Sequence, residues 1–231
     1  FLVQIIGAEV NDEKTTRGME IIISNVSPKT HFFSKIIAGN LFVFIQAGII
    51  FLAGVLGLVV RTMITPKSAN LSGFIDFQGI ISALTTSGIM DKLWIVIPLT
   101  LILLVLSFLA YSLVAGILAS MTTNIEDYQQ IQTPIIIISL VGYYLAIMAA
   151  MFNGSIFIRI MSYIPFISSL LSPALLIMGQ ITIVDVLISI GIMGLTIFLL
   201  IKYGLKIYKV GILNYSSSKL WSKMFKAVKE K

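Results

Sequence analysis

The sequence has no cysteine and a single histidine, His31. Without cysteine, disulfides and thiolate metal sites are excluded, and one histidine cannot form an H-E-x-x-H zinc site. No G-x-x-x-x-G-K-S/T loop occurs, so the chain does not bind ATP in the P-loop manner. The apolar segments hold no pair of carboxylates and no serine–histidine arrangement, which argues against an intramembrane enzyme. We therefore expect no catalytic residue, no metal and no directly bound cofactor.

Charged residues are also scarce: they make up 11% of the chain, against roughly a quarter in soluble domains. Hydrophobic residues reach 58%, and they are gathered in uncharged runs of roughly 18 to 29 residues, the length that a helix needs to cross a bilayer. The sequence thus predicts an all-α polytopic membrane protein forming one transmembrane domain, residues 1–231. We expect four complete transmembrane helices, at residues 36–60, 93–121, 135–152 and 183–201. Residues 1–8 (FLVQIIGA) are too short to cross, so we expect them to be the end of a preceding helix.

The first polar segment, residues 9–35, is patterned as a helix. Glu13 and Arg17 lie four residues apart in the favourable acid-first order, which indicates a helix over residues 9–24. Ser27 is a good N-cap and Pro28 suits the first position of a helix, so a new helix should begin there. From the residues alone, this segment is either a cytoplasmic coupling segment on which a soluble partner acts or an ordinary solvated linker.

Residues 155–181 are apolar but contain Arg159, Pro165 and Pro173. Two prolines fit two short helices that enter the membrane and return, an outer re-entrant hairpin, better than one straight crossing. With four spans, twelve Lys and Arg residues share one side and four lie on the other, whereas a fifth span would put the eight of the tail outside. We therefore expect a multi-pass protein of the cell membrane whose coupling segment and C-terminus are both cytoplasmic.

The net charge of +6 comes largely from lysines next to the expected spans, where they meet anionic lipid headgroups. The lysine-rich tail, residues 202–231, ends in a stretch whose apolar and basic residues fall on opposite helical faces, as in helices that lie on a membrane surface. The expected partner of this charge is the lipid bilayer, and no nucleic acid is expected.

Few polar side chains interrupt the spans. Four of them are candidates for a substrate path: Asn40, Gln46, Asn153 and Asp185. Asp185 has a second interpretation, as a helix-end residue that reaches water.

Several motifs resemble one family. Residues 13–20 read EKTTRGME and are followed by IIISNVSP and Lys35. This pattern resembles the E-K-x-x-R-x-M-E … S-x-x-S-P … K signature of type-2 ABC exporter permeases, above all their sodium-extrusion and multidrug-type branch. Residues 125–134 (IEDYQQIQTP) are similar to the family's E-D-x-Q-Q … P connection, with Tyr128 in place of a smaller residue. Residues 163–173 look like its outer re-entrant segment, although residues 176–180 read LIMGQ in place of the Met and Arg that usually follow.

The resemblance implies a bacterial-type assembly of two permease copies, identical or homologous, with two cytoplasmic ABC ATPase subunits that bind ATP and Mg. It also implies a first span and an extracellular domain before Phe1, and a coupling helix that docks in a groove of the ATPase. On the matching positions, the coupling contact would comprise Glu13, Lys14, Arg17, Met19, Glu20 and Ile21. A second cytoplasmic contact would comprise Glu126, Asp127, Gln129 and Gln130.

The expected function is that of the membrane-spanning permease subunit of an ATP-driven exporter, with hydrolysis on a separate subunit. The cargo would be a sodium ion or a drug, peptide or lipid-like molecule, and the scarcity of polar groups in the spans favours an amphipathic cargo. The alternative is a membrane scaffold or sensor that transports nothing and recruits a soluble partner.

Overall fold

The computed structural model describes residues 1–64, 93–152 and 154–214. Within these ranges every regular element is helical, and four helices are long and apolar enough to cross a membrane. These are α3 (Pro28–Ile64), α5 (Leu93–Met121), α6 (Ile125–Met148) and α9 (Ile183–Gly211). The structure thus confirms the prediction of an all-α polytopic membrane protein with four complete spans.

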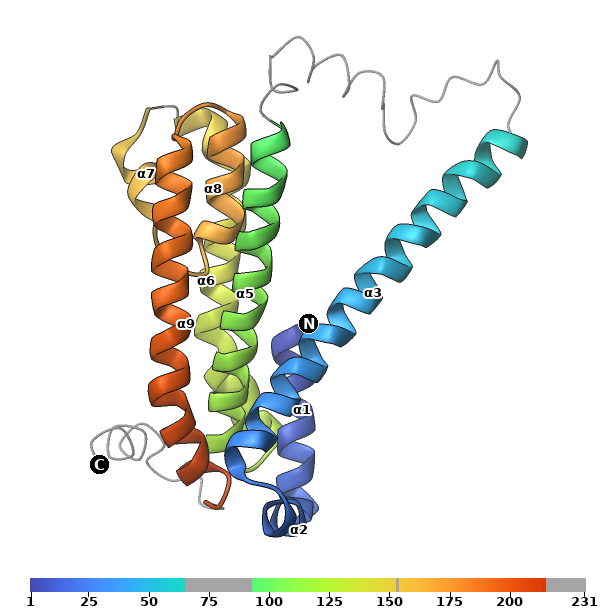
Figure 1. Ribbon diagram of the computed structural model, residues 1–231, viewed down its shortest axis with the longest axis vertical. Coiled ribbons are helices and arrows are strands. Elements are labelled where there is room, and N and C mark those ends of the chain that lie inside the picture. Colours follow the sequence, from blue (N-terminus) through green and yellow to red (C-terminus); the bar gives the residue numbers. More distant parts are fainter. Residues whose placement is uncertain (65–92, 153, 215–231) are drawn as a thin grey trace.

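Figure 1 shows α5, α6, α9 and the shorter α8 (Ser168–Ile177) side by side as a bundle. At one end, α1 (Leu2–Thr15) packs against α5, and the short α2 (Gly18–Asn25) follows it; we call this the α2 end. At the opposite end lies α7 (Ile156–Met161), and we call this the α7 end.

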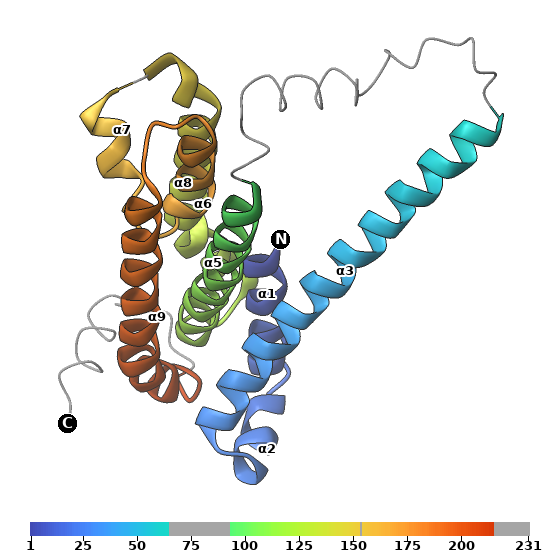
Figure 2. The ribbon, with the colours of Figure 1, turned by 45° about the horizontal axis from the view of Figure 1, so that its top comes forward.

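Helix α3 starts beside α1 and then leans away from the bundle (Figure 1), and Figure 2 shows the same divergence from another direction. A Cβ added at Gly48, Gly54 or Gly57 would meet nothing within 4 Å, so this half of α3 has no packing partner among the described residues. Its apolar side chains are exposed all round, as expected of a helix that is surrounded by lipid.

The predicted helix over residues 9–24 is divided in two. Helix α1 runs unbroken from Leu2 to Thr15, and Arg17 then adopts a left-handed backbone conformation with φ of 56° before α2 begins. The second break falls where it was predicted: α3 starts at Pro28, and the Ser27 hydroxyl accepts the backbone N–H of Thr30 at 3.2 Å.

The third span was predicted at residues 135–152, but its helix starts ten residues earlier. Helix α6 already begins at Ile125, because the Asn124 side chain accepts the backbone N–H of Asp127 at 2.8 Å and two acidic residues follow in the first turn. Pro134 therefore lies inside the helix and not at its start. The helix continues through this one missing N–H, and Tyr128, in its first turn, is fully buried against the rest of the protein.

The stretch 155–181 forms two short helices, α7 and α8, as the two prolines predicted; its position in a membrane stays a prediction. Pro165 lies in the connection and Pro173 lies inside α8. A 3-10 turn, Ala149–Phe152, precedes this hairpin. The last helix, α9, is ten residues longer than the predicted span at residues 183–201, because Gly204, Ile207, Tyr208 and Gly211 continue its buried face.

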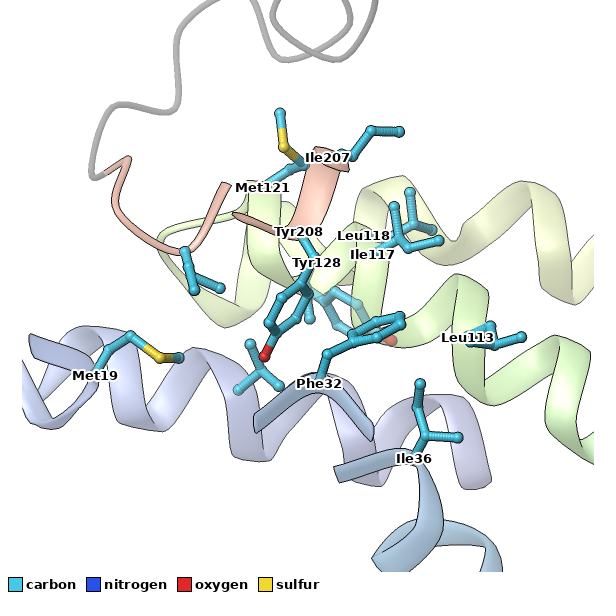
Figure 3. Packing of buried hydrophobic residues seen from close by; sticks show 13 residues of the cluster. Met19, Phe32, Ile36, Leu113, Ile117, Leu118, Met121, Tyr128, Ile207 and Tyr208 are labelled. Atoms are coloured by element: carbon cyan, nitrogen blue, oxygen red, sulfur yellow. The ribbon is translucent and has the colours of Figure 1, made fainter. Parts of the chain in front are cut away.

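The largest buried apolar cluster lies at the α2 end (Figure 3). It joins Met19 of α2 and Phe32 of α3 to Leu113 of α5, Tyr128 of α6 and Tyr208 of α9, and the rings of Phe32 and Tyr208 lie 4.5 Å apart. Val10 of α1 also belongs to it, so six helices contribute and the cluster holds α2 against the ends of the spans.

Candidate functional site

The contacts that hold α1 against α3, α5, α6 and α9 form what we call the α1 junction. Its most buried charge is Lys14, which is 1% exposed. The Lys14 ammonium donates to three backbone carbonyls, those of Ser120 at 2.7 Å, Gly211 at 3.1 Å and Asn214 at 3.2 Å. Ser120 and Gly211 belong to the ends of α5 and α9, and Asn214 follows α9 by three residues, so one side chain of α1 joins the last turns of two spans.

Next to Lys14, an ion-pair network joins α1 to α3 and α9. The Glu13 carboxylate lies 2.6 Å from the Lys35 ammonium and 3.1 Å from His31 Nε2, and Lys35 also pairs with Glu9 at 2.5 Å. On its other side, His31 Nδ1 lies 2.8 Å from the Tyr208 hydroxyl. Glu13 and His31 are thus parts of the internal structure of the chain.

Burial alone would raise the pKa of Glu13, but hydrogen bonds from His31 and Lys35 outweigh it and hold the pKa below its ordinary value of 4.5. A carboxylate with a lowered folded-state pKa stabilises the fold above its ordinary pKa, and this contribution disappears as the pH falls through the folded-state value.

We therefore expect Glu13→Gln to melt at a lower temperature than the wild-type chain at neutral pH, with a gap that closes below pH 4.5. Thermal melts in detergent from neutral pH to about pH 3.5 measure this gap. Glu20→Gln, at an exposed position of α2, is the matched control. A gap for Glu13→Gln that stays constant over the whole range would contradict the assignment.

Helix α6 is held against α1 by Tyr128. The ring occupies a notch at Gly7, where an added Cβ would lie 2.0 Å from two ring carbons, and the hydroxyl donates to the Val3 carbonyl at 2.6 Å. One turn further along, Gln132 Nε2 donates to Gln4 Oε1 at 2.7 Å. Tyr128 stands where the family pattern that the sequence resembles has a smaller residue, and Gly7 leaves the space that the larger side chain needs.

The six residues predicted for the coupling contact divide into two groups. Glu13, Lys14 and Met19 point into the protein, and Met19 is fully buried in the apolar cluster. The expectation that Met19 enters a groove of a partner does not fit this placement. Arg17, Glu20 and Ile21 are exposed, and Ile21 shows 70% of its surface.

The four residues of the predicted second contact lie at the start of α6, beside α1. Glu126, Gln129 and Gln130 are exposed, and Asp127 is half-buried in the first turn. Between this start and α1 lies a shallow groove of about 760 Å³, lined by Ile5, Ala8, Glu9, Asn11, Asp12, Thr15, Asn124 and Ile125. The structure therefore brings the segments of both predicted contacts to one end of the molecule.

The candidates for a substrate path do not meet one another. Asn40 is buried between α3 and α5, where its Nδ2 donates to Ser112 Oγ at 2.8 Å, and Gln46 lies half-buried on α3 beyond it. Asp185 lies at the start of α9, and Asn153 lies outside the described residues. The interpretation of Asp185 as a residue that reaches water is wrong, because it is 3% exposed.

Asp185 instead holds the α7 end together. One carboxylate oxygen accepts hydrogen bonds from Arg159, at 2.8 Å, and from the Tyr163 hydroxyl. The other accepts the Thr182 backbone N–H at 2.8 Å and its hydroxyl at 2.9 Å, which completes a capping box at the start of α9. Arg159, predicted for the re-entrant segment, is thus tied to α9 although its side chain remains about half exposed.

An apolar cavity of about 550 Å³ lies between α1, α3, α5, α6 and α8, and the sequence did not indicate it. Its polar feature is a hydrogen bond of 2.7 Å between the Tyr111 hydroxyl and Ser139 Oγ. Phe1, Leu2, Val3, Val43, Phe108, Ile135, Ile136, Leu140, Tyr143 and Leu170 complete the lining. No sequence motif marks it, because its walls come from five separate helices.

Four membrane-length helices around a buried junction define the chain as an integral membrane protein of the helical class. The family model of the ABC-2 family transporter proteins matches residues 1–205, and the chain belongs to this family as a membrane component of transport. It is 30% identical over 226 residues to the uncharacterized protein YhaP of Bacillus subtilis (strain 168), an alignment that covers 98% of this chain. The chain spans about half, 50%, of the length of that relative. No solved structure matches the chain.

Proposed function

We propose that the chain is the permease subunit of an ATP-driven exporter, and that α2 is the element on which a separate ABC ATPase acts. The family typically pairs with an ATPase subunit. The observation that carries the proposal is the form of α2: it is a short helix held rigidly by the buried Met19, while Arg17, Glu20 and Ile21 face outward. A helix that is fixed on one face and free on the other suits a contact through which a partner moves the spans.

In this proposal the α2 end is cytoplasmic, and the exposed start of α6 forms the second contact. ATP and Mg would bind to the ATPase, and two permease copies would form the pathway in a cell membrane. The groove between α1 and α6 supports a common contact surface, because it lies between the two predicted segments.

The cargo that fits the described spans is an amphipathic molecule, such as a drug, peptide or lipid-like compound. Asn40 is bonded to Ser112 of another helix, and Ser107 and Thr196 are bonded to carbonyls of their own helices. The cavity of about 550 Å³ is lined mainly by apolar groups. A hydrated sodium path would need polar groups that converge, and the described residues do not supply them. Stimulation of ATP hydrolysis in vesicles by hydrophobic peptides and not by sodium is the expected result; stimulation by sodium alone would contradict this cargo class.

The ATPase contact is tested by Ile21→Glu. A charge in the middle of the exposed face of α2 would have to be buried on docking, so we expect the ATPase subunit to be lost from the purified complex. The fold should be unaffected, because surface substitutions usually change stability by less than about 0.5 kcal/mol.

The matched control is Lys29→Glu, which reverses an exposed charge at the start of α3, outside both predicted contacts. Co-purification is measured for both variants beside a thermal melt of the permease. If both variants keep the ATPase, α2 is not the docking element. If an unmodified chain brings down no ATPase, the alternative of a scaffold without transport is favoured.

A further inference from the structure

We propose that Lys14 is the positioning residue through which a displacement of α1 and α2 is transmitted to the spans α5 and α9. The inference rests on the proposed function, since it requires that a partner acts on α2. It assigns to one side chain a step that the family membership leaves open.

The location of Lys14 suits this task. It lies one residue before the end of α1, and three residues before the left-handed turn at Arg17 from which α2 departs. Its ammonium has three N–H groups, and three carbonyls receive them. A displacement of α2 therefore reaches the Lys14 ammonium through only the turn at Arg17 and the last residues of α1.

Two of the three acceptors are carbonyls at the end of a helix, and such carbonyls suit a lysine ammonium. The last carbonyls of a helix have no partner within the helix and carry the negative end of its dipole. Ser120 is one residue from the end of α5, and Gly211 is the last residue of α9. Because Lys14 is 1% exposed, water does not replace these bonds when they are stretched.

Helices α5 and α9 meet closely where Lys14 binds them. A Cβ at Gly211 would lie 2.6 Å from Ser120 Oγ and 2.8 Å from the Ser120 carbonyl, and one at Gly204 would lie 2.2 Å from Ile117. The two helix ends are therefore in direct backbone contact, and they must move together when Lys14 moves.

The other polar ties of α1 lead to α3, to α6 or to the residue after α5, and Glu13 reaches Tyr208 of α9 only through His31. Glu9 and Glu13 reach α3 through Lys35, and Gln4 reaches α6 through Gln132. Asn11 accepts a longer bond of 3.2 Å from Thr122, just beyond α5. Among the described contacts, Lys14 makes the charged link between α1 and both α5 and α9.

The test uses the full-length chain in complex with its ATPase, and the absence of cysteine in residues 1–231 gives a clean background for spin labels. One pair of labels replaces the exposed Val184 of α9 and Met151 after α6, at the α7 end. In the wild-type background, trapping the complex with ADP and vanadate should change the distance between these labels. In Lys14→Met the ATPase should stay bound and trap nucleotide, but the distance change should be lost.

Lys206→Met removes an exposed lysine from the same part of α9 and should keep the full distance change. If Lys14→Met does not elute as a single folded species, Lys14→Gln is measured instead, because its amide still donates to carbonyls but carries no charge; a much reduced change is then expected. A folded variant that binds the ATPase and shows the wild-type distance change would overturn this inference alone. Failure of the unmodified chain to bind an ATPase would overturn the proposed function, and this inference with it.

Discussion

Gly7→Ala is expected to lower the free energy of unfolding by more than about 3 kcal/mol, beyond the usual range for overpacked cores. The new Cβ would lie 2.0 Å from two ring carbons of Tyr128 and 2.4 Å from its hydroxyl oxygen. The ring cannot turn away easily, because Tyr128 is fully buried and its hydroxyl is bound to the Val3 carbonyl. Helix α6 would have to separate from α1 to make room.

A second-site change should relieve this clash. Tyr128→Ala alone is expected to cost about 3–5 kcal/mol through the cavity that it leaves. In the double variant, the methyl group introduced by Gly7→Ala occupies part of that cavity, so we expect it to be no less stable than Tyr128→Ala alone. The coupling energy between the two positions should be about 2 kcal/mol or more in the favourable direction.

Gly48→Ala is the matched control on α3, because its Cβ would meet nothing within 4 Å. Alanine favours a helix over glycine by roughly 0.5–1 kcal/mol, so this variant should be slightly more stable than the wild-type chain. Thermal or denaturant unfolding in detergent measures the stability of the wild-type chain and of all these variants, and the purified yield of each is recorded as well. Additive losses at Gly7 and Tyr128 would show that the two residues do not share one space.

Asp185→Ala is expected to have the second largest effect, because both oxygens of its carboxylate are occupied. Loss of the capping box alone should cost about 1 kcal/mol, and loss of charge-assisted bonds to the carboxylate adds to it. The change also leaves the Tyr163 hydroxyl and the Arg159 guanidinium without the carboxylate that joins α7 to α9. We therefore expect α7 to loosen together with the first turn of α9.

This effect separates a structural role of Asp185 from a role in a substrate path. If the residue only holds the α7 end together, a stable Asp185→Asn variant should keep transport, because an amide can still accept bonds through its oxygen. Hydrogen exchange over α7 and the start of α9 measures the loosening in Asp185→Ala, and Gln46→Ala on α3 serves as the control at another candidate position. Loss of transport in Asp185→Asn with unchanged exchange would favour the substrate path.

The four spans could be predicted from the sequence because each is an uncharged run of sufficient length, and hydrocarbon admits few other structures. The break before Pro28 could be predicted for a local reason, since Ser27 and Pro28 are adjacent residues with known preferences at a helix start. Two short helices around Pro165 and Pro173 follow in the same way from backbone constraints of proline.

The features that could not be predicted depend on contacts between residues that are distant in the sequence. Lys14 and Met19 looked like surface residues in a charged segment, but their pockets are built by α5, α6 and α9, more than one hundred residues away in the case of Ser120. The third span was predicted to start at residue 135, whereas α6 starts at Ile125, where Asn124 caps it and Tyr128 is buried against other helices. Asp185 looked accessible because Arg159 and Tyr163 approach it only in the folded chain.

The left-handed turn at Arg17 has a consequence for the orientation of α2. A residue other than glycine in this conformation costs about 1–2 kcal/mol, so the local backbone would relax if α1 and α2 straightened into one continuous rod. The bend is kept because Met19, two residues after Arg17, is buried in the apolar cluster. The turn at Arg17 is therefore kept in an unfavourable conformation by the burial of Met19. We expect the angle between α1 and α2 to change whenever the Met19 pocket rearranges.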